Sequence, residues 1–87
     1  MTRGDRVVKR PHITEKAMDL MDFENKMQFM VRTDATKDDI AKEIEDEYGT
    51  DVADVNTQIT MQGDKKATVE FAEDDMAQDI ASRMGAF

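Results

Sequence analysis

The sequence predicts an α+β fold in the order β-α-β-α-β-β-α, a two- to three-layer sandwich of three helices and a mainly antiparallel four-stranded sheet. Two periodicities predict it: apolar residues recur at helical spacing in three segments, and they alternate with polar residues in segments between them. Threonine, aspartate and glycine stand where these segments begin or end, as helix caps and turns require. With 87 residues we expect a single domain, 1–87.

The first half of the chain carries signals for a strand, a helix and a second strand. We expect a short strand at 6–9, followed by a helix that Thr14 caps and that ends near Asp22. Polar and apolar residues then alternate over 24–32, which indicates a half-buried strand. Its inward face is expected to hold Met27, Phe29 and Val31, and its outward face Lys26, Gln28, Met30 and Arg32.

A second helix is predicted between Thr36 and Gly49. Thr36 and Asp39 approximate a capping box, and Gly49 is typical of a C-cap. The apolar stripe of this helix is Ile40, Ala41, Ile44 and Tyr48. Its acidic face is expected on the solvent side and consists of Glu43, Glu45, Asp46 and Glu47.

The second half of the chain ends in a hairpin and a third helix. Residues 55–61 and 67–71 alternate as strands, and a short turn at 62–65 joins them. The side chains expected to face inward are Val55, Thr57, Ile59, Met61, Ala67, Val69 and Phe71. The last helix is expected to begin near Asp75, with Gln78 at the capping-box position, and to close at Gly85.

Charge is divided unequally along the chain. The basic N-terminal segment 1–16 holds five basic and two acidic side chains, a balance of +3, whereas seven basic and eighteen acidic groups give the remainder −11, for a total of −8. Because local basic patches decide where phosphate backbones bind, this segment, and 11–16 in particular, indicates an RNA-facing edge. We interpret the acid excess as adaptation to a salt-rich cytoplasm, since the periodic apolar residues argue against a disordered acidic segment.

One face of the predicted sheet is polar and holds few acids. Its expected residues are Lys26, Gln28, Arg32, Asn56, Gln58, Thr60, Lys66 and Thr68. Two interpretations stay open at this point: an RNA-binding surface continuous with the N-terminal segment, or an ordinary solvated sheet face.

Residue types exclude several chemistries. The chain has no cysteine, and its one histidine, His12, lacks the surroundings of a nucleophilic triad. Residues 34–45 match part of a calcium loop, but Asp39 stands where that loop needs glycine. We therefore expect no enzyme, no catalytic or metal-binding residue, no cofactor and no small-molecule substrate.

The chain also lacks the usual membrane signals. Its apolar runs are shorter than the roughly 20 residues of a membrane helix, and its N-terminus lacks the apolar stretch of a signal peptide. We expect a cytoplasmic protein that does not insert into membranes.

Six ordered segments of the chain resemble one known family. The first is Pro11-His12-Ile13-Thr14-Glu15-Lys16-Ala17, and the others are 25–31, 35–40, 55–57, 63–67 and 80–85. Together they resemble the universal large-subunit ribosomal protein number twenty-three. The turn at 62–65 is much shorter than the long hairpin arm with which bacterial members enter the exit tunnel, which indicates the archaeal form, and the acid excess indicates a halophilic host.

The resemblance implies a structural constituent of the large ribosomal subunit, bound to large-subunit rRNA beside the polypeptide exit tunnel. It also implies contact with ribosomal protein twenty-nine of that subunit, and transient docking of the signal recognition particle and the Sec translocon. The alternative is a free-standing acidic α+β protein-interaction module, which would give the segment from Pro11 to Lys16 no special role.

Site residues follow from the resemblance by position. The rRNA-facing residues that it implies are Lys9, Arg10, His12, Thr14, Lys16, Lys26, Asn56, Thr57, Lys65 and Lys66. Arg3 and Arg6 are added on their charge alone.

Overall fold

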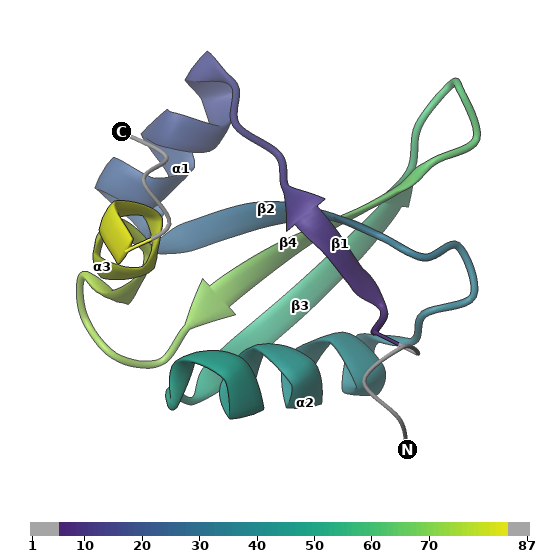
Figure 1. The fold of residues 1–87 in the computed structure, drawn as a ribbon. Coiled ribbons are helices and arrows are strands. Elements are labelled where there is room, and N and C mark those ends of the chain that lie inside the picture. Colours follow the sequence, from purple (N-terminus) through teal and green to yellow (C-terminus); the bar gives the residue numbers. More distant parts are fainter. Residues whose placement is uncertain (1–5, 84–87) are drawn as a thin grey trace.

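The computed structural model describes residues 6–83 and confirms the predicted α+β class and element order. The elements are β1 (Val8–Pro11), α1 (Glu15–Glu24), β2 (Lys26–Val31), α2 (Lys37–Tyr48), β3 (Val52–Ile59), β4 (Lys65–Phe71) and α3 (Met76–Arg83). The strands form one sheet in the order β1-β2-β4-β3, with every neighbouring pair antiparallel. Helix α2 packs along β3, α1 and α3 lie together at one end of the sheet, and the β3–β4 connection projects away from the helices (Figure 1).

One apolar core joins the sheet to all three helices. The inward side chains of β2 are Met27, Phe29 and Val31, as predicted, and all three are buried. The core residues that the helices contribute include Met21 of α1, Ile40 and Ile44 of α2, and Ala77, Ile80 and Ala81 of α3. Burial of such side chains supplies most of the stability of a chain this small.

Two of the predicted helix starts are confirmed in detail. The Thr14 hydroxyl oxygen accepts the Ala17 N–H at 3.1 Å. At α2, Thr36 and Asp39 form a reciprocal capping box with hydrogen bonds of 3.1 and 3.2 Å. Gly49 ends α2 at φ 64°, a left-handed conformation that glycine adopts without steric cost. Helix α1 ends at Glu24, two residues beyond the predicted end.

The start of α3 differs from the prediction. Asp75 lies in the left-handed region at φ 61°, and Gln78 donates to Asp22 Oδ1 of α1 at 2.9 Å and does not form a capping box. The Ala77 N–H instead donates to Asn25 Oδ1 at 2.9 Å. A side chain distant in sequence therefore caps the helix. The predicted end at Gly85 lies outside the described residues.

The predicted strand at 6–9 is found two residues later, as β1. Glu43 of α2 explains the shift, because its carboxylate accepts the backbone N–H groups of Val7 at 2.9 Å and Val8 at 3.0 Å. Glu45 similarly accepts the Val52 N–H at 3.0 Å. The prediction of a wholly solvent-facing acidic side for α2 was wrong for these two half-buried glutamates.

Burial overturns two further expectations. Met61, expected in the core, is fully exposed at 101%, because β3 ends at Ile59 and Met61 belongs to the connection to β4. Ile59 itself is 60% exposed, near the end of the hairpin that projects from the body (Figure 1). Gln28 and Met30 lie on the outward face of β2 as predicted, yet they are only 5% and 6% exposed.

Candidate nucleic-acid interface

The strand register sorts the polar face of the sheet into three rows. The cationic row consists of Arg10, Met30, Lys66 and Gln58. The amide row consists of Gln28, Thr68 and Asn56. The acidic row consists of Lys26, Glu70 and Asp54. Residues that lie directly opposite in neighbouring antiparallel strands have Cβ atoms about 4.5–5.5 Å apart, so each row is a line of adjacent side chains.

Exposure of this face increases from β2 to β3. On β2, Gln28 and Met30 are buried, whereas Lys66 and Thr68 on β4 are half-buried. The outward residues of β3 are exposed. The accessible part of the polar face is therefore its β3–β4 half, with Arg10 exposed on β1 at the other end of the cationic row.

The amide row is tied together by hydrogen bonds. The Gln28 amide Nε2 donates to Thr68 Oγ1 at 3.2 Å, and the backbone N–H of His12 donates to the Gln28 carbonyl at 2.8 Å. Asn56 lies at the exposed end of the row. Its amide can donate through the NH2 group and accept through the oxygen, which suits contacts with sugar and phosphate groups. His12 is thereby held next to β2 and half-buried.

The acidic row corrects the expectation that acids are scarce on this face. Glu70 lies directly opposite Lys26 and Asp54 lies beyond Glu70, while the Lys26 ammonium group is 3.1 Å from Glu24 Oε1. The hydrogen bond to Glu24 is the main cause that raises the pKa of Lys26, and the charges of Glu24, Glu70 and Asp54 act in the same direction. Lys26 stays protonated, but carboxylates surround its charge.

Three other predicted site residues are not brought to this face. The Lys65 ammonium donates to the Ala35 carbonyl at 2.6 Å, and Thr57 pairs with the core residue Ala67. Arg6 forms ion pairs with Glu43 and Glu47 of α2. The cationic groups of Lys65 and Arg6 face protein neighbours, and Thr57 lies on the core side of the sheet.

The rest of the predicted site lies on the segment from β1 to α1. Lys9, Arg10 and Lys16 are exposed, and Lys9 falls where the β1 register is irregular. The hydroxyl oxygen of Thr14 accepts the helix cap hydrogen bond, which leaves its own O–H free to donate. Arg3 lies outside the described residues.

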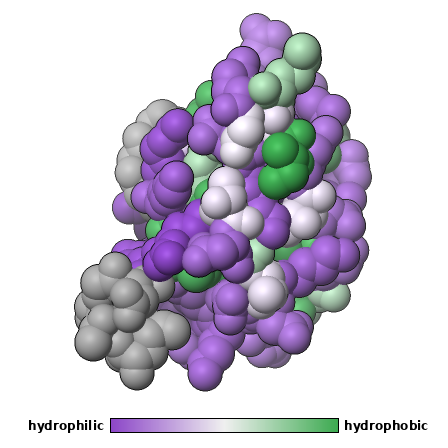
Figure 2. Space-filling view, turned by 90° about the vertical axis from the view of Figure 1, so that its right-hand side faces the viewer, coloured by the Kyte–Doolittle hydropathy of each residue, from purple (hydrophilic) through white to green (hydrophobic). Residues whose placement is uncertain are grey.

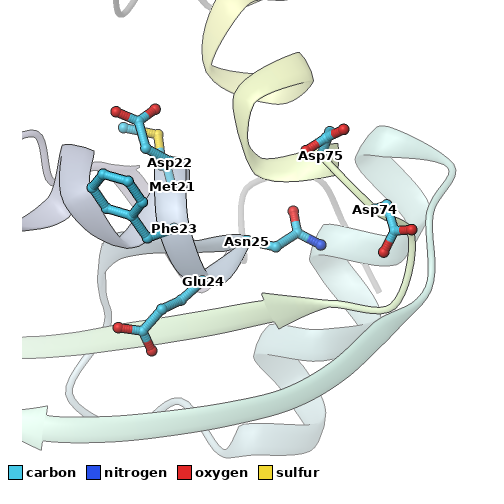
Figure 3. A pocket seen from close by; sticks show the side chains of 7 residues that line it. All are labelled: Met21, Asp22, Phe23, Glu24, Asn25, Asp74 and Asp75. Atoms are coloured by element: carbon cyan, nitrogen blue, oxygen red, sulfur yellow. The ribbon is translucent and has the colours of Figure 1, made fainter.

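A second feature is an open hollow of about 390 Å³ between the C-terminal end of α1 and the start of α3. Its lining residues are Met21, Asp22, Phe23, Glu24, Asn25, Asp74 and Asp75 (Figure 3). Asn25, at φ 56°, donates through Nδ2 to the carbonyls of Phe71 and Glu73, which fixes the turn between β4 and α3. Within residues 6–83 no group of three acidic or histidine side chains is arranged to hold a metal ion.

Sequence reasoning missed the two structural anchors, Glu43 and Asn25. An asparagine that directly follows a helix is a known signal for a left-handed cap, so the backbone of Asn25 could have been predicted. Its three side-chain contacts and those of Glu43 depend on which elements become neighbours in space.

The surface on the hairpin side is mostly hydrophilic or neutral, with apolar colour confined to small patches (Figure 2). In the described part of the chain, no helix is both long and apolar enough to cross a membrane. The geometry thus offers a polar surface with localised cations, which suits contact with a polyanion.

Comparison with known proteins places the chain among ribosomal proteins. The family model described as ribosomal protein L23 matches residues 6–78. The chain belongs to this family. The large ribosomal subunit protein uL23 of Haloquadratum walsbyi is 58% identical over 81 residues, which cover 93% of this chain and 96% of the relative. Membership of the L23 family agrees with the prediction of a structural, non-enzymatic protein.

Other relatives extend the match beyond salt-loving species. The uL23 protein of Haloarcula marismortui is 54% identical over 93% of this chain and 95% of its own length. That of Methanothermobacter thermautotrophicus is 40% identical over 93% of this chain and 94% of its own length. The higher identity to haloarchaeal members of the L23 family supports the prediction of an archaeal, halophilic form.

Proposed function

We propose that this chain is a structural constituent of the large ribosomal subunit, where it binds large-subunit rRNA near the polypeptide exit tunnel. Family membership is the observation that carries the proposal. The exposed cations of the β1–α1 segment and the half-buried Lys66 of the cationic row are the groups that would make the phosphate contacts of such binding. The protein is then cytoplasmic and bound to ribosomes.

The proposed contact residues fall into two groups. Lys9, Arg10, His12, Thr14 and Lys16 form the N-terminal group, and Asn56 and Lys66 form the sheet group. Five further residues remain proposed contacts: Arg3, Arg6, Lys26, Thr57 and Lys65. Arg6, Lys26 and Lys65 would need to exchange protein partners, Thr57 lies on the core side of the sheet, and Arg3 lies outside the described residues.

Further partners are proposed from the family resemblance. They are ribosomal protein twenty-nine of the large subunit, and the signal recognition particle and Sec translocon as transient partners at a docking platform. The acidic side of α2 offers less free charge to a basic factor than the sequence suggested, because Glu43 and Glu45 bind backbone N–H groups. The acidic side of α2 consists of Glu43, Glu45, Asp46 and Glu47. Of these, Asp46 is the exposed carboxylate that remains free to attract such a factor.

Sedimentation of a cell extract tests the proposal. The extract is run through a gradient in molar potassium chloride with magnesium, and the fractions are probed for this chain. Comigration with the large subunit supports the proposal. A chain that stays at the top of the gradient overturns it in favour of the free-standing interaction module.

Salt dependence tests how the contacts work. Because each neutralised phosphate makes affinity fall with salt, we expect shape and hydrogen bonds to carry more of the binding in molar salt than the cations do. Arg10→Ala and Lys16→Ala should therefore impair assembly more at low salt than at high salt. Equal losses at both salt concentrations would contradict this view.

A further inference from the structure

We infer that the β3–β4 half of the polar face binds the backbone of double-helical RNA. The RNA backbone lies beside the cationic row and does not extend to the acidic row. The inference rests on the proposed function, and it adds the class of RNA and the direction from which it is bound. It depends on three observations: the register, the residue types of the face, and its charge gradient.

The residue types argue against a platform for unpaired bases. Recognition of single-stranded RNA depends on aromatic side chains against which bases stack. Among the described residues, Phe29 and Phe71 lie in the core, Tyr48 packs against it from α2, and Phe23 lies on α1. The β3–β4 half of the polar face therefore has no aromatic side chain in the described chain.

Its side chains instead suit the edge of an RNA helix. Asn56 and Gln58 carry exposed amide groups. Thr68, on the strand between β2 and β3, carries a half-buried hydroxyl group. Such groups donate to phosphate and accept from or donate to the 2′-hydroxyl groups that line the shallow minor groove of double-helical RNA. Lys66 lies opposite Gln58 and adds the cation that a phosphate requires.

The charge gradient sets the limit of the bound helix. Lys66 and Glu70 are four residues apart on β4, a separation of about 13 Å along an extended strand. The Debye length is about 8 Å at physiological salt and about 3 Å at 1 M salt. The charges at each end of the face therefore act mainly on groups close to them. A phosphate is attracted beside Lys66 and repelled beside Glu70 and Asp54.

Binding of the refolded full chain to three short probes tests the class of RNA. The probes are an RNA duplex of about 16 base pairs, one of its strands alone, and the DNA duplex of the same sequence. We expect at least tenfold tighter binding to the RNA duplex than to either of the other probes, by fluorescence anisotropy. Equal or tighter binding to the single strand would overturn the inference.

A matched lysine pair tests whether the RNA binds at the cationic row. Lys66→Ala should weaken binding to the RNA duplex and reduce the slope of log affinity against log salt by about 1. Lys42→Ala, at an exposed position of α2 away from this face, should change affinity less than twofold and leave the slope unchanged. Equal effects of the two substitutions would contradict binding at the cationic row.

Directed cleavage in assembled subunits separates this inference from the proposed function. Because the chain has no cysteine, Gln58→Cys and Asp54→Cys each provide one attachment point for an iron chelate that cuts nearby RNA. From position 58 we expect cuts on both strands of a paired rRNA segment, and from position 54 weaker ones. Cuts confined to unpaired nucleotides would overturn the duplex inference alone, whereas absence of the wild-type chain from large subunits would overturn the proposed function.

Discussion

Strands β2 and β3 belong to the same sheet but differ in what surrounds them. Every residue of β2 after Lys26 is buried, on both faces of the strand, whereas β3 is largely exposed and buries only Val55 fully. The reason is position: β2 has a neighbour on each side, and β3 lies at the edge of the sheet. The interior strand is therefore expected to serve stability and the edge strand to serve binding.

A pair of methionines gives the largest expected effect. Met30→Ala, on β2, should lower the free energy of unfolding by about 2 kcal/mol, at the low end of values for buried methionine. Met61→Ala, at the exposed end of the hairpin, should change it by less than about 0.5 kcal/mol. Denaturant unfolding in molar salt measures both. The sequence pattern alone predicts the reverse order, so a larger loss for Met61→Ala would contradict the structural comparison.

The other edge strand, β1, should depend on Glu43. Glu43→Ala removes the acceptor for the N–H groups of Val7 and Val8, and we expect the free energy of unfolding to fall by about 1.5 kcal/mol. Hydrogen exchange at these two amides should accelerate at the same time. Asp46→Ala, on the exposed side of the same helix, is the control and should stay within about 0.5 kcal/mol. Unchanged exchange at Val7 and Val8 would show that β1 is held by its pairing with β2 alone.

Two glutamines sharpen the comparison of the strands. Gln28→Ala removes a buried hydrogen bond to Thr68 and should lower the free energy of unfolding by about 1 kcal/mol. Gln58→Ala on β3 should alter stability by less than about 0.5 kcal/mol while weakening RNA binding. The same unfolding and anisotropy measurements apply. If Gln58→Ala destabilised the fold as much as Gln28→Ala, the edge strand would not be free for binding.

The smallest effect is confined to alkaline pH and concerns Tyr48 of α2. Burial and the neighbouring Glu47 carboxylate raise the pKa of Tyr48 from 10.0 to about 12. Between these values the unfolded chain loses the phenol proton first, so stability should fall as pH rises from about 10 to about 12. As the chain has one tyrosine, its ultraviolet titration reports this group directly. Tyr48→Phe should remove this part of the pH dependence, and a titration near pH 10 in the folded protein would contradict it.

Much of the fold could be predicted because local rules decide it. The alternation in β2 and the helical stripe of α2 reflect the geometry of each element, and the caps at Thr14 and Thr36 bond backbone groups three residues away. Where a partner is distant, prediction failed. The start of β1 depends on Glu43, 35 residues from Val8, and the cap of α3 depends on Asn25, 52 residues from Ala77.

The candidate site was predicted in part. Its basic N-terminal segment is visible as an excess of lysine and arginine, and Arg10, Asn56 and Lys66 do lie on one face. Alternation could not reveal that Arg6 pairs with α2, that Lys65 binds a backbone carbonyl, or that Glu70 and Asp54 share a row with Lys26. A period of two assigns a side chain to a face, but it does not name the neighbours on that face.

By itself, the sequence determined the order and type of the elements, their core faces, the charge division and the family resemblance, because each depends on residues near one another in the chain. Tertiary structure alone decided the strand order β1-β2-β4-β3, and through it which strand is interior and which is at the edge. That order aligns Arg10, Lys66 and Gln58 in one row and buries Met30 between them. Pairing between distant strands is a property of the whole packed domain, because each strand is stabilised only by the neighbours that the fold brings to it.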